Sequence, residues 1–149
     1  MKRYQTQGGA AAVELGILLI PLILITFGVT EFGRAIYTYN TLVKATRDAT
    51  RFLSGQGPGD PVDITVAQCL VVYGNRTCTG NALAPGLNAS MINICDSSNC
   101  TDHKNQATGS GVINIVSVTV SNYRFTSLVP FATPDFNFGP ISTTMRQVL

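Results

Sequence analysis

The stretch Gly9-Ala-Ala-Ala-Val-Glu-Leu15 continues directly into the apolar run GILLIPLILITFGV, which occupies residues 16–29. No ionisable side chain lies between Glu14 and Glu31. About 20 residues from Ala10 to Val29, at roughly 1.5 Å each, match a hydrocarbon core roughly 30 Å thick. The run therefore predicts a transmembrane helix over residues 10–30, in which Pro21 is tolerated as it would not be in water.

Glu14 is unusual because its carboxylate lies one turn inside this apolar segment. An ionised carboxylate within lipid costs at least roughly 2.5 kcal/mol, so we expect it to have a partner. The alternative is that the span begins at Leu15 and Glu14 lies among the lipid headgroups. Residue chemistry alone leaves both interpretations open.

The segment from Gly9 to Glu14 resembles the processing site of type IV prepilins and pseudopilins. The longer string, which adds the apolar run and Thr30-Glu-Phe-Gly-Arg-Ala35, resembles the TadE-like family. Members of that family are minor pilin-like components of the tight-adherence (Flp pilus) machinery. Major Flp prepilins carry Glu-Tyr at the site, whereas this chain has Glu14-Leu15, which favours a minor component.

This resemblance implies that a prepilin peptidase cuts between Gly9 and Ala10 and removes a cytoplasmic leader, residues 1–9. Glu14 would then be the fifth mature residue and would meet the terminal amine of a neighbouring subunit. The implied partners are other pilins or pseudopilins, the peptidase, the inner-membrane assembly platform and the lipid bilayer. The implied function is structural, in assembly or initiation of a pilus for surface attachment.

Lys2 and Arg3 precede the span, and positive residues favour the cytoplasmic side. We therefore expect a single-pass protein of the bacterial inner membrane, with a cytoplasmic amino terminus and a periplasmic carboxyl-terminal domain. Incorporation into an extracellular pilus stays open. A cleaved secretory signal peptide is the rival, but the run is long for that class and no Ala-x-Ala pattern closes it before Glu31.

Residues 31–54 are expected to continue the helix beyond the membrane as an amphipathic periplasmic half. Spacings of three and four residues place a mostly apolar stripe on one helix face, made of Phe32, Ala35, Tyr39, Leu42, Thr46, Ala49 and Leu53. The stripe can pack on the chain's own domain, on another helix of a filament, or on both.

Residues 55–61 contain three glycines and two prolines with Ser54 just before them, which predicts a hinge after the helix. The rest, residues 62–149, is expected to form a small exoplasmic α+β domain. Residues 63–73 favour a short helix with strand left open, residues 112–125 alternate as a strand, and residues 141–148 suggest a last strand. The predicted fold is α+β: a long amino-terminal helix packed on a small, disulfide-bonded antiparallel sheet.

The chain has four cysteines, and an even number outside the cytoplasm indicates disulfides. They are Cys69, Cys78, Cys95 and Cys100. Pairing of the first two and of the last two closes the shortest loops, although the sequence does not decide among the three pairings. A zinc site from these thiols and His103 is the alternative, but neither cysteine spacing is usual for zinc.

Four phenylalanines surround the prolines near the carboxyl end: Phe125, Phe131, Phe136 and Phe138. They can fill the core of a domain that has few other aromatic residues, or form an apolar contact patch for another protein.

The composition argues against several classes of function. A net charge of +2 with 12% charged residues does not suggest a nucleic-acid binder. No nucleophile, base or phosphate-binding motif stands out, and His103 is expected to be an exposed loop residue, so we expect neither an enzyme nor a bound metal or cofactor. The alternative to a pilin is a bitopic envelope protein whose disulfide-bonded domain binds a ligand or a protein without entering a filament.

Overall fold

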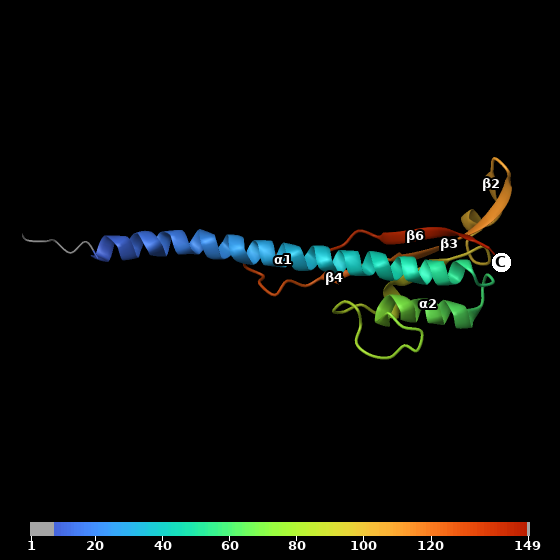
Figure 1. The fold of residues 1–149 in the computed structure, drawn as a ribbon, viewed down its shortest axis with the longest axis horizontal. Helices are drawn as coiled ribbons and strands as arrows, with labels where there is room; N and C mark the ends of the chain where they lie inside the picture. Colours follow the sequence, from blue (N-terminus) through green and yellow to red (C-terminus); the bar gives the residue numbers. More distant parts are fainter. Residues whose placement is uncertain (1–7, 149) are drawn as a thin grey trace, which may run out of the picture.

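The computed structural model describes residues 8–148, as a long helix with a small domain folded around its carboxyl-terminal half (Figure 1). The helical elements are α1 (Gly8–Ser54), α2 (Pro61–Tyr73) and the short 3-10 helices η1 (Ala89–Met91) and η2 (Thr101–His103). The strands are β1 (Ile92–Cys95), β2 (Gln106–Thr108), β3 (Gly111–Val120), β4 (Arg124–Phe125), β5 (Phe136–Asn137) and β6 (Ile141–Gln147). The expected α+β fold is confirmed.

Helix α1 has 47 residues and continues through Pro21 without a break. At about 1.5 Å per residue it is roughly 70 Å long, which is more than twice the thickness of a hydrocarbon core. Its carboxyl-terminal half contacts the domain, whereas its amino-terminal half extends beyond it (Figure 1). Among the described residues α1 is the one helix long and apolar enough to cross a membrane.

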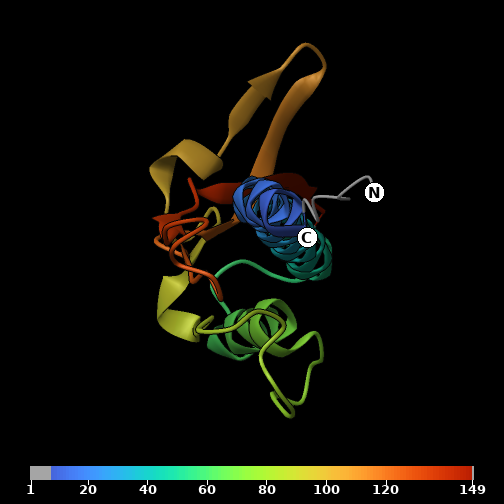
Figure 2. The same cartoon turned by 90° about the vertical axis from the view of Figure 1, so that its left-hand side faces the viewer.

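The domain encloses this half of α1 from two sides. The end-on view shows α2 on one side of α1 and the sheet that contains β6 on another (Figure 2). Helix α2 begins where Asp60 caps it, because the Asp60 side chain accepts a hydrogen bond from the Val62 amide. It ends at Gly74, which adopts the left-handed conformation that glycine allows at a helix end.

Strand β3 is the centre of the sheet. It pairs antiparallel with β1 on one side and β6 on the other, so that Val118 lies opposite both Ile94 and Thr143. The alternate residues Val116, Val118 and Val120 are buried and belong to the hydrophobic core that α1 also enters. The predicted alternation holds for the valines of its carboxyl-terminal half, although Ser117 on the other face is also buried, while its first residues form an exposed hairpin with β2.

Two threonines join α1 to β6. The hydroxyls of Thr46 and Thr143 lie 3.1 Å apart, and the Thr50 hydroxyl donates to the Thr143 carbonyl at 3.3 Å. Thr46 also donates to the Val43 carbonyl at 2.9 Å, and the single Thr50 hydroxyl proton is shared with the Thr46 carbonyl at 2.7 Å. Thr46 and Thr50 are fully buried, so these bonds satisfy polar groups that would otherwise destabilise the core.

The segment between the two helices, which we predicted as a hinge, is bonded to the sheet and to the loop after β1. The Gln56 carbonyl accepts from the Gln147 side chain at 3.1 Å, and the Gly59 amide donates to Asp96 at 2.8 Å. Gly59 has a φ of 77°, and a Cβ there would lie 2.8 Å from the Ser98 hydroxyl oxygen. Glycine is thus required at this contact.

Leu42 tests the packing of α1 in the domain, because it is fully buried in the core. We expect Leu42→Ala to lower the free energy of unfolding by about 2–5 kcal/mol, since it leaves a cavity. Urea unfolding of the detergent-solubilised chain, followed by near-ultraviolet circular dichroism, measures this change. Lys44→Ala is the control on an exposed position of the same helix, and we expect a change within about 0.5 kcal/mol. Equal effects of the two substitutions would contradict this packing.

Candidate assembly surface

The residues expected to be processed and to assemble lie at the free end of α1. Gly9 and Ala10 are in its first turn, and Glu14 follows one turn later; all three are exposed. Within residues 8–148 the ion pairs are Arg34 with Glu31 and Arg124 with Asp135. The Glu14 carboxylate therefore has no charged partner in the described part of its own chain.

The apolar side chains that follow Glu14 are exposed around the whole helix. None of the most apolar stretch of α1 is buried by the domain. The polar groups within it are bonded inside the helix: the hydroxyls of Thr26 and Thr30 donate to the carbonyls of Leu22 and Thr26, each at 2.8 Å. A helix with an apolar circumference and satisfied hydroxyls suits lipid rather than water.

A buried charged cluster lies where this apolar surface ends. Glu31 is 3% exposed, and its two oxygens accept from Arg34 at 2.7 and 2.8 Å. Glu31 also accepts from the backbone amide of Leu128 at 3.1 Å. The Arg34 guanidinium lies over the Phe125 ring, 5.2 Å from its centroid. Helix α1 and the loop after β4 are thus joined at the membrane end of the domain.

The pKa of the Glu31 carboxyl results from opposing effects. Burial raises this pKa. Hydrogen bonds from Arg34, the Leu128 amide and Ser127, together with the positive charge of Arg34, lower it by more than burial raises it. The net pKa is below the usual value for glutamate. Because the folded pKa is depressed, the ionised carboxylate stabilises this contact at neutral pH, and that contribution is lost as the pH falls through the folded pKa.

The structure buries only part of the stripe predicted on α1. Five of its seven members are buried against the domain: Ala35, Leu42, Thr46, Ala49 and Leu53. Phe32 and Tyr39 are exposed, Phe32 by 66%. These two rings border a shallow apolar groove of about 230 Å³, completed by Ala35, Ile36, Asn40, Phe136 and Phe138.

The four phenylalanines near the carboxyl end are divided in the same way. Phe125 is buried, and Phe138 packs partly on the core. Phe136 is half-exposed, and Phe131 is mostly exposed. The cluster therefore fills the core with two rings and presents the other two on the surface.

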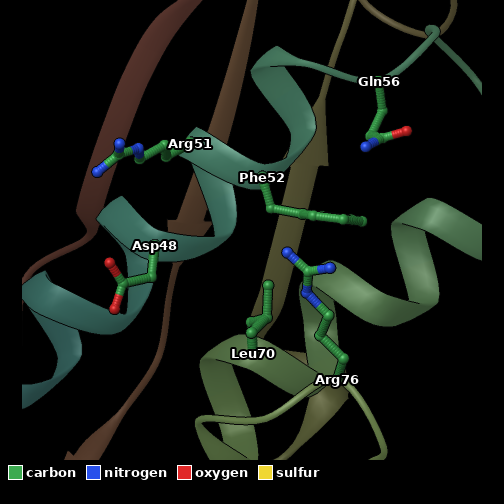
Figure 3. A pocket seen from close by; sticks show the side chains of 6 residues that line it. All are labelled: Asp48, Arg51, Phe52, Gln56, Leu70 and Arg76. Carbon is green, nitrogen blue, oxygen red and sulfur yellow. The ribbon is translucent and has the colours of Figure 1, made fainter.

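A second hollow, of about 430 Å³, lies between α1 and α2 (Figure 3). The Arg76 guanidinium lies over the Phe52 ring at 4.9 Å, and Leu70 forms part of the wall. Asp48 and Arg51 add charges at the rim. The six side chains that line this hollow include no serine, cysteine or histidine.

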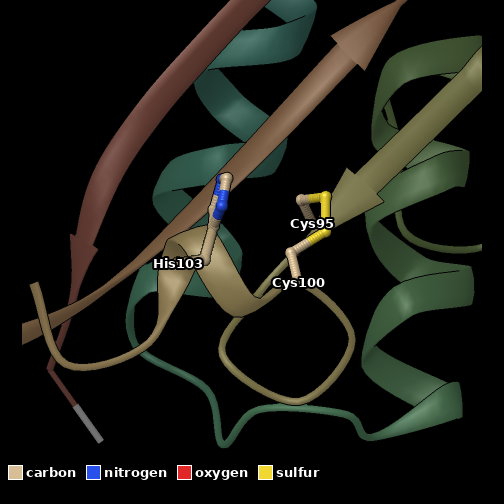
Figure 4. Close-up of side chains that lie close together, drawn as sticks. All are labelled: Cys95, Cys100 and His103. Carbon is tan, nitrogen blue, oxygen red and sulfur yellow. A yellow bond between two sulfur atoms is a disulfide. The ribbon is translucent and has the colours of Figure 1, made fainter.

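The cysteines form two disulfides in the structure, Cys69 with Cys78 and Cys95 with Cys100. These are the pairings that close the shortest loops. The sulfurs of Cys95 and Cys100 lie within 4.8 Å of a His103 ring nitrogen (Figure 4). Sulfurs joined in a disulfide are not thiolates, which are the form that binds metal, so the oxidised site is not a zinc site.

His103 is not the exposed loop residue that we expected. It is half-buried, and its Nε2 lies 2.8 Å from the Ser117 hydroxyl on β3. The segment after the second disulfide folds over the outer face of β3, which also buries Ser117. The histidine covers the sheet, and its position depends on contacts that the sequence does not show.

Residues 9–51 match a family model described as TadE-like protein. Over these residues the chain is similar to the TadE-like family. The match confirms the predicted resemblance, and no curated protein or solved structure matches the chain significantly. The TadE-like segment covers almost all of α1 and ends three residues before its last residue. It supports a protein associated with pilus machinery, and the apolar half of α1 fits a single-pass membrane protein.

Sequence reasoning missed Glu31 and Leu128 as contact residues. The spacing of Glu31 and Arg34 places both on one side of a helix and was a signal for their pairing. The Leu128 amide, in contrast, is 97 residues away along the chain. No local pattern indicates a bond between a helix carboxylate and a distant loop amide.

The NMR shift of the Leu128 amide reports the protonation of Glu31, because this amide donates a hydrogen bond to the Glu31 carboxylate. In the chain in detergent micelles, we expect the NMR shift of this amide to titrate with a midpoint below the usual glutamate pKa. Glu31→Gln should abolish that titration, because the amide side chain carries no ionisable proton. Asp96→Asn is the control, since Asp96 also has a lowered pKa but accepts hydrogen bonds elsewhere in the domain. A midpoint at or above the usual value would contradict the cluster.

Proposed function

We propose that this protein is a TadE-like minor pilin or pseudopilin, a structural component in the assembly or initiation of a tight-adherence pilus for surface attachment. The observation that carries the proposal is the free half of α1. It combines a full apolar circumference with a carboxylate, Glu14, that has no charged partner within residues 8–148. A neighbouring subunit can supply both the missing charge and part of the missing cover.

The proposed assembly begins in the bacterial inner membrane, with the amino terminus in the cytoplasm and the domain in the periplasm. Prepilin peptidase cuts between Gly9 and Ala10, which gives Ala10 a free, positively charged amine. That amine on one subunit neutralises Glu14 on the next. A buried carboxylate without its partner is strongly unfavourable, so the pair favours the assembled state over the isolated helix.

The part of the stripe that the domain leaves uncovered supports a second contact. Phe32 and Tyr39 are exposed beside the apolar groove, just above the membrane half of α1. In the assembled protein these rings would pack against a neighbouring pilin or pseudopilin, while the five buried stripe residues hold the domain. The domain requires no cofactor for this role, and we propose that the protein is not an enzyme.

Glu14→Ala tests the proposed charge pair. We expect membrane insertion and domain stability to be unchanged, because Glu14 contacts nothing in the domain, and assembly to be strongly weakened. Breaking a buried pair typically costs about 3–5 kcal/mol. Carbonate extraction of membranes measures insertion, and crosslinking to partner pilins with pilus counts measures assembly. Asp48→Ala is the control, since it removes an exposed acidic residue from the other half of α1. Normal assembly of Glu14→Ala would refute the charge pair.

Amino-terminal sequencing of the protein purified from membranes separates the two candidate functions. A processed pilin begins at Ala10, because the peptidase cuts after Gly9. A bitopic envelope protein that never enters a filament keeps Met1. Gly9→Leu provides the control, since it should block the cut without altering the span. Met1 as the only amino terminus of the parent chain would contradict the pilin proposal.

A further inference from the structure

The loop between β4 and β5 is uncharged and largely apolar from Thr126 to Pro134. From Phe125 to Pro134 it reads FTSLVPFATP, with no ionisable side chain. Charges occur only where the loop leaves and rejoins the domain, where Arg124 and Asp135 form an ion pair at 3.1 Å. Asp135 also accepts from the Ser127 amide at 2.9 Å, which closes the base of the loop.

This loop reaches the membrane half of α1. The Phe131 ring packs edge to face on Phe27, with 6.1 Å between the ring centroids. Phe27 belongs to the apolar run and lies one turn, or about 6 Å, on the membrane side of Glu31. The orange loop that follows β4 reaches further toward the amino-terminal end of α1 than the rest of the domain (Figure 1).

The apolar side chains at the tip are exposed. Leu128 is 72% exposed and Phe131 is 70% exposed. Phe131 adjoins Phe27, an apolar side chain of the span that is itself 40% exposed. Exposed apolar patches of this kind mark contact surfaces, and this patch is continuous with the surface of α1 that lipid covers.

Five of the six backbone amides between Ser127 and Thr133 are bonded within the described chain, and the amide of Phe131 at the tip is the exception. From Ser127 to Pro134, the amides of Ser127, Leu128 and Val129 donate to side-chain oxygens. The amides of Ala132 and Thr133 donate to the Val129 carbonyl, at 2.9 and 3.1 Å. Pro130 and Pro134 have no backbone N–H. Irregular backbone near a membrane is tolerated where its polar groups are bonded within the protein.

We propose that this loop is a second membrane contact, which inserts Leu128 and Phe131 into the outer headgroup and acyl boundary beside α1. The occupant of the exposed tip is lipid, because the tip continues the lipid-covered surface of the span and carries no charge. The loop thereby fixes the rotation of α1 and the height of the domain above the bilayer. This inference depends on the membrane span and is independent of pilus assembly.

The chain contains no tryptophan, so a single introduced tryptophan reports on its own surroundings. Phe131→Trp is reconstituted as the full chain in phosphatidylcholine vesicles, with circular dichroism to confirm folding. We expect its tryptophan emission to lie to the blue of that of Val112→Trp and to be quenched by brominated phosphatidylcholine. Aqueous iodide should quench it several-fold less than it quenches Val112→Trp. Val112 is the matched control: it is 66% exposed, in the β2–β3 hairpin at the opposite end of the domain.

Ile20→Trp marks the span and should be quenched by brominated lipid. Once brominated lipid quenches Ile20→Trp, the span is shown to be inserted. If iodide then quenches Phe131→Trp as strongly as Val112→Trp, the proposal is overturned. Protection of Phe131→Trp from iodide without quenching by brominated lipid would also overturn it, since another copy of the chain would then cover the tip. If Phe131→Trp does not fold, Leu128→Trp gives the same measurement at the second exposed position.

Discussion

The apolar surface of the first half of α1 is the constraint on which the rest of the structure depends. A helix that is apolar on every side and unburied by its own domain is stable only where something other than water surrounds it. The domain accordingly leaves this half uncovered and contacts the other half. One continuous helix of 47 residues therefore has two environments. Its side chains change from exposed and apolar to packed against the domain at the boundary between them.

The Glu31 cluster lies at that change. A buried carboxylate next to an apolar span would be unfavourable alone, but two bonds from Arg34 and one from the Leu128 amide compensate its burial. The bond from the Leu128 amide holds the loop after β4 beside the helix, and Phe131 packs on Phe27 just beyond it. One buried carboxylate thus bonds both to its own helix and to the apolar loop.

The division of the helix stripe has a related cause. Near the carboxyl end of α1, the sheet and α2 lie on two sides and bury every stripe residue from Leu42 onward. Nearer the membrane only the short strands β4 and β5 and the loop between them remain, which cannot cover Phe32 and Tyr39. A stripe that forms one surface in the sequence is thus buried by the domain from Leu42 onward and is exposed at Phe32 and Tyr39.

The sequence by itself determined the long apolar helix, the α+β class, the strand β3 and the TadE-like segment, because each depends on residues adjacent in the chain. Runs of apolar residues, caps and alternation act over a turn or a strand and leave a visible pattern. The tertiary structure alone decided that β1 and β2 form within the Asn-rich segment, that Thr143 pairs with Thr46, and that His103 covers Ser117. It also decided that Glu31 binds the loop at Leu128. These contacts join residues whose separation reaches 97 positions, and only the packing of the whole domain brings their atoms within bonding distance.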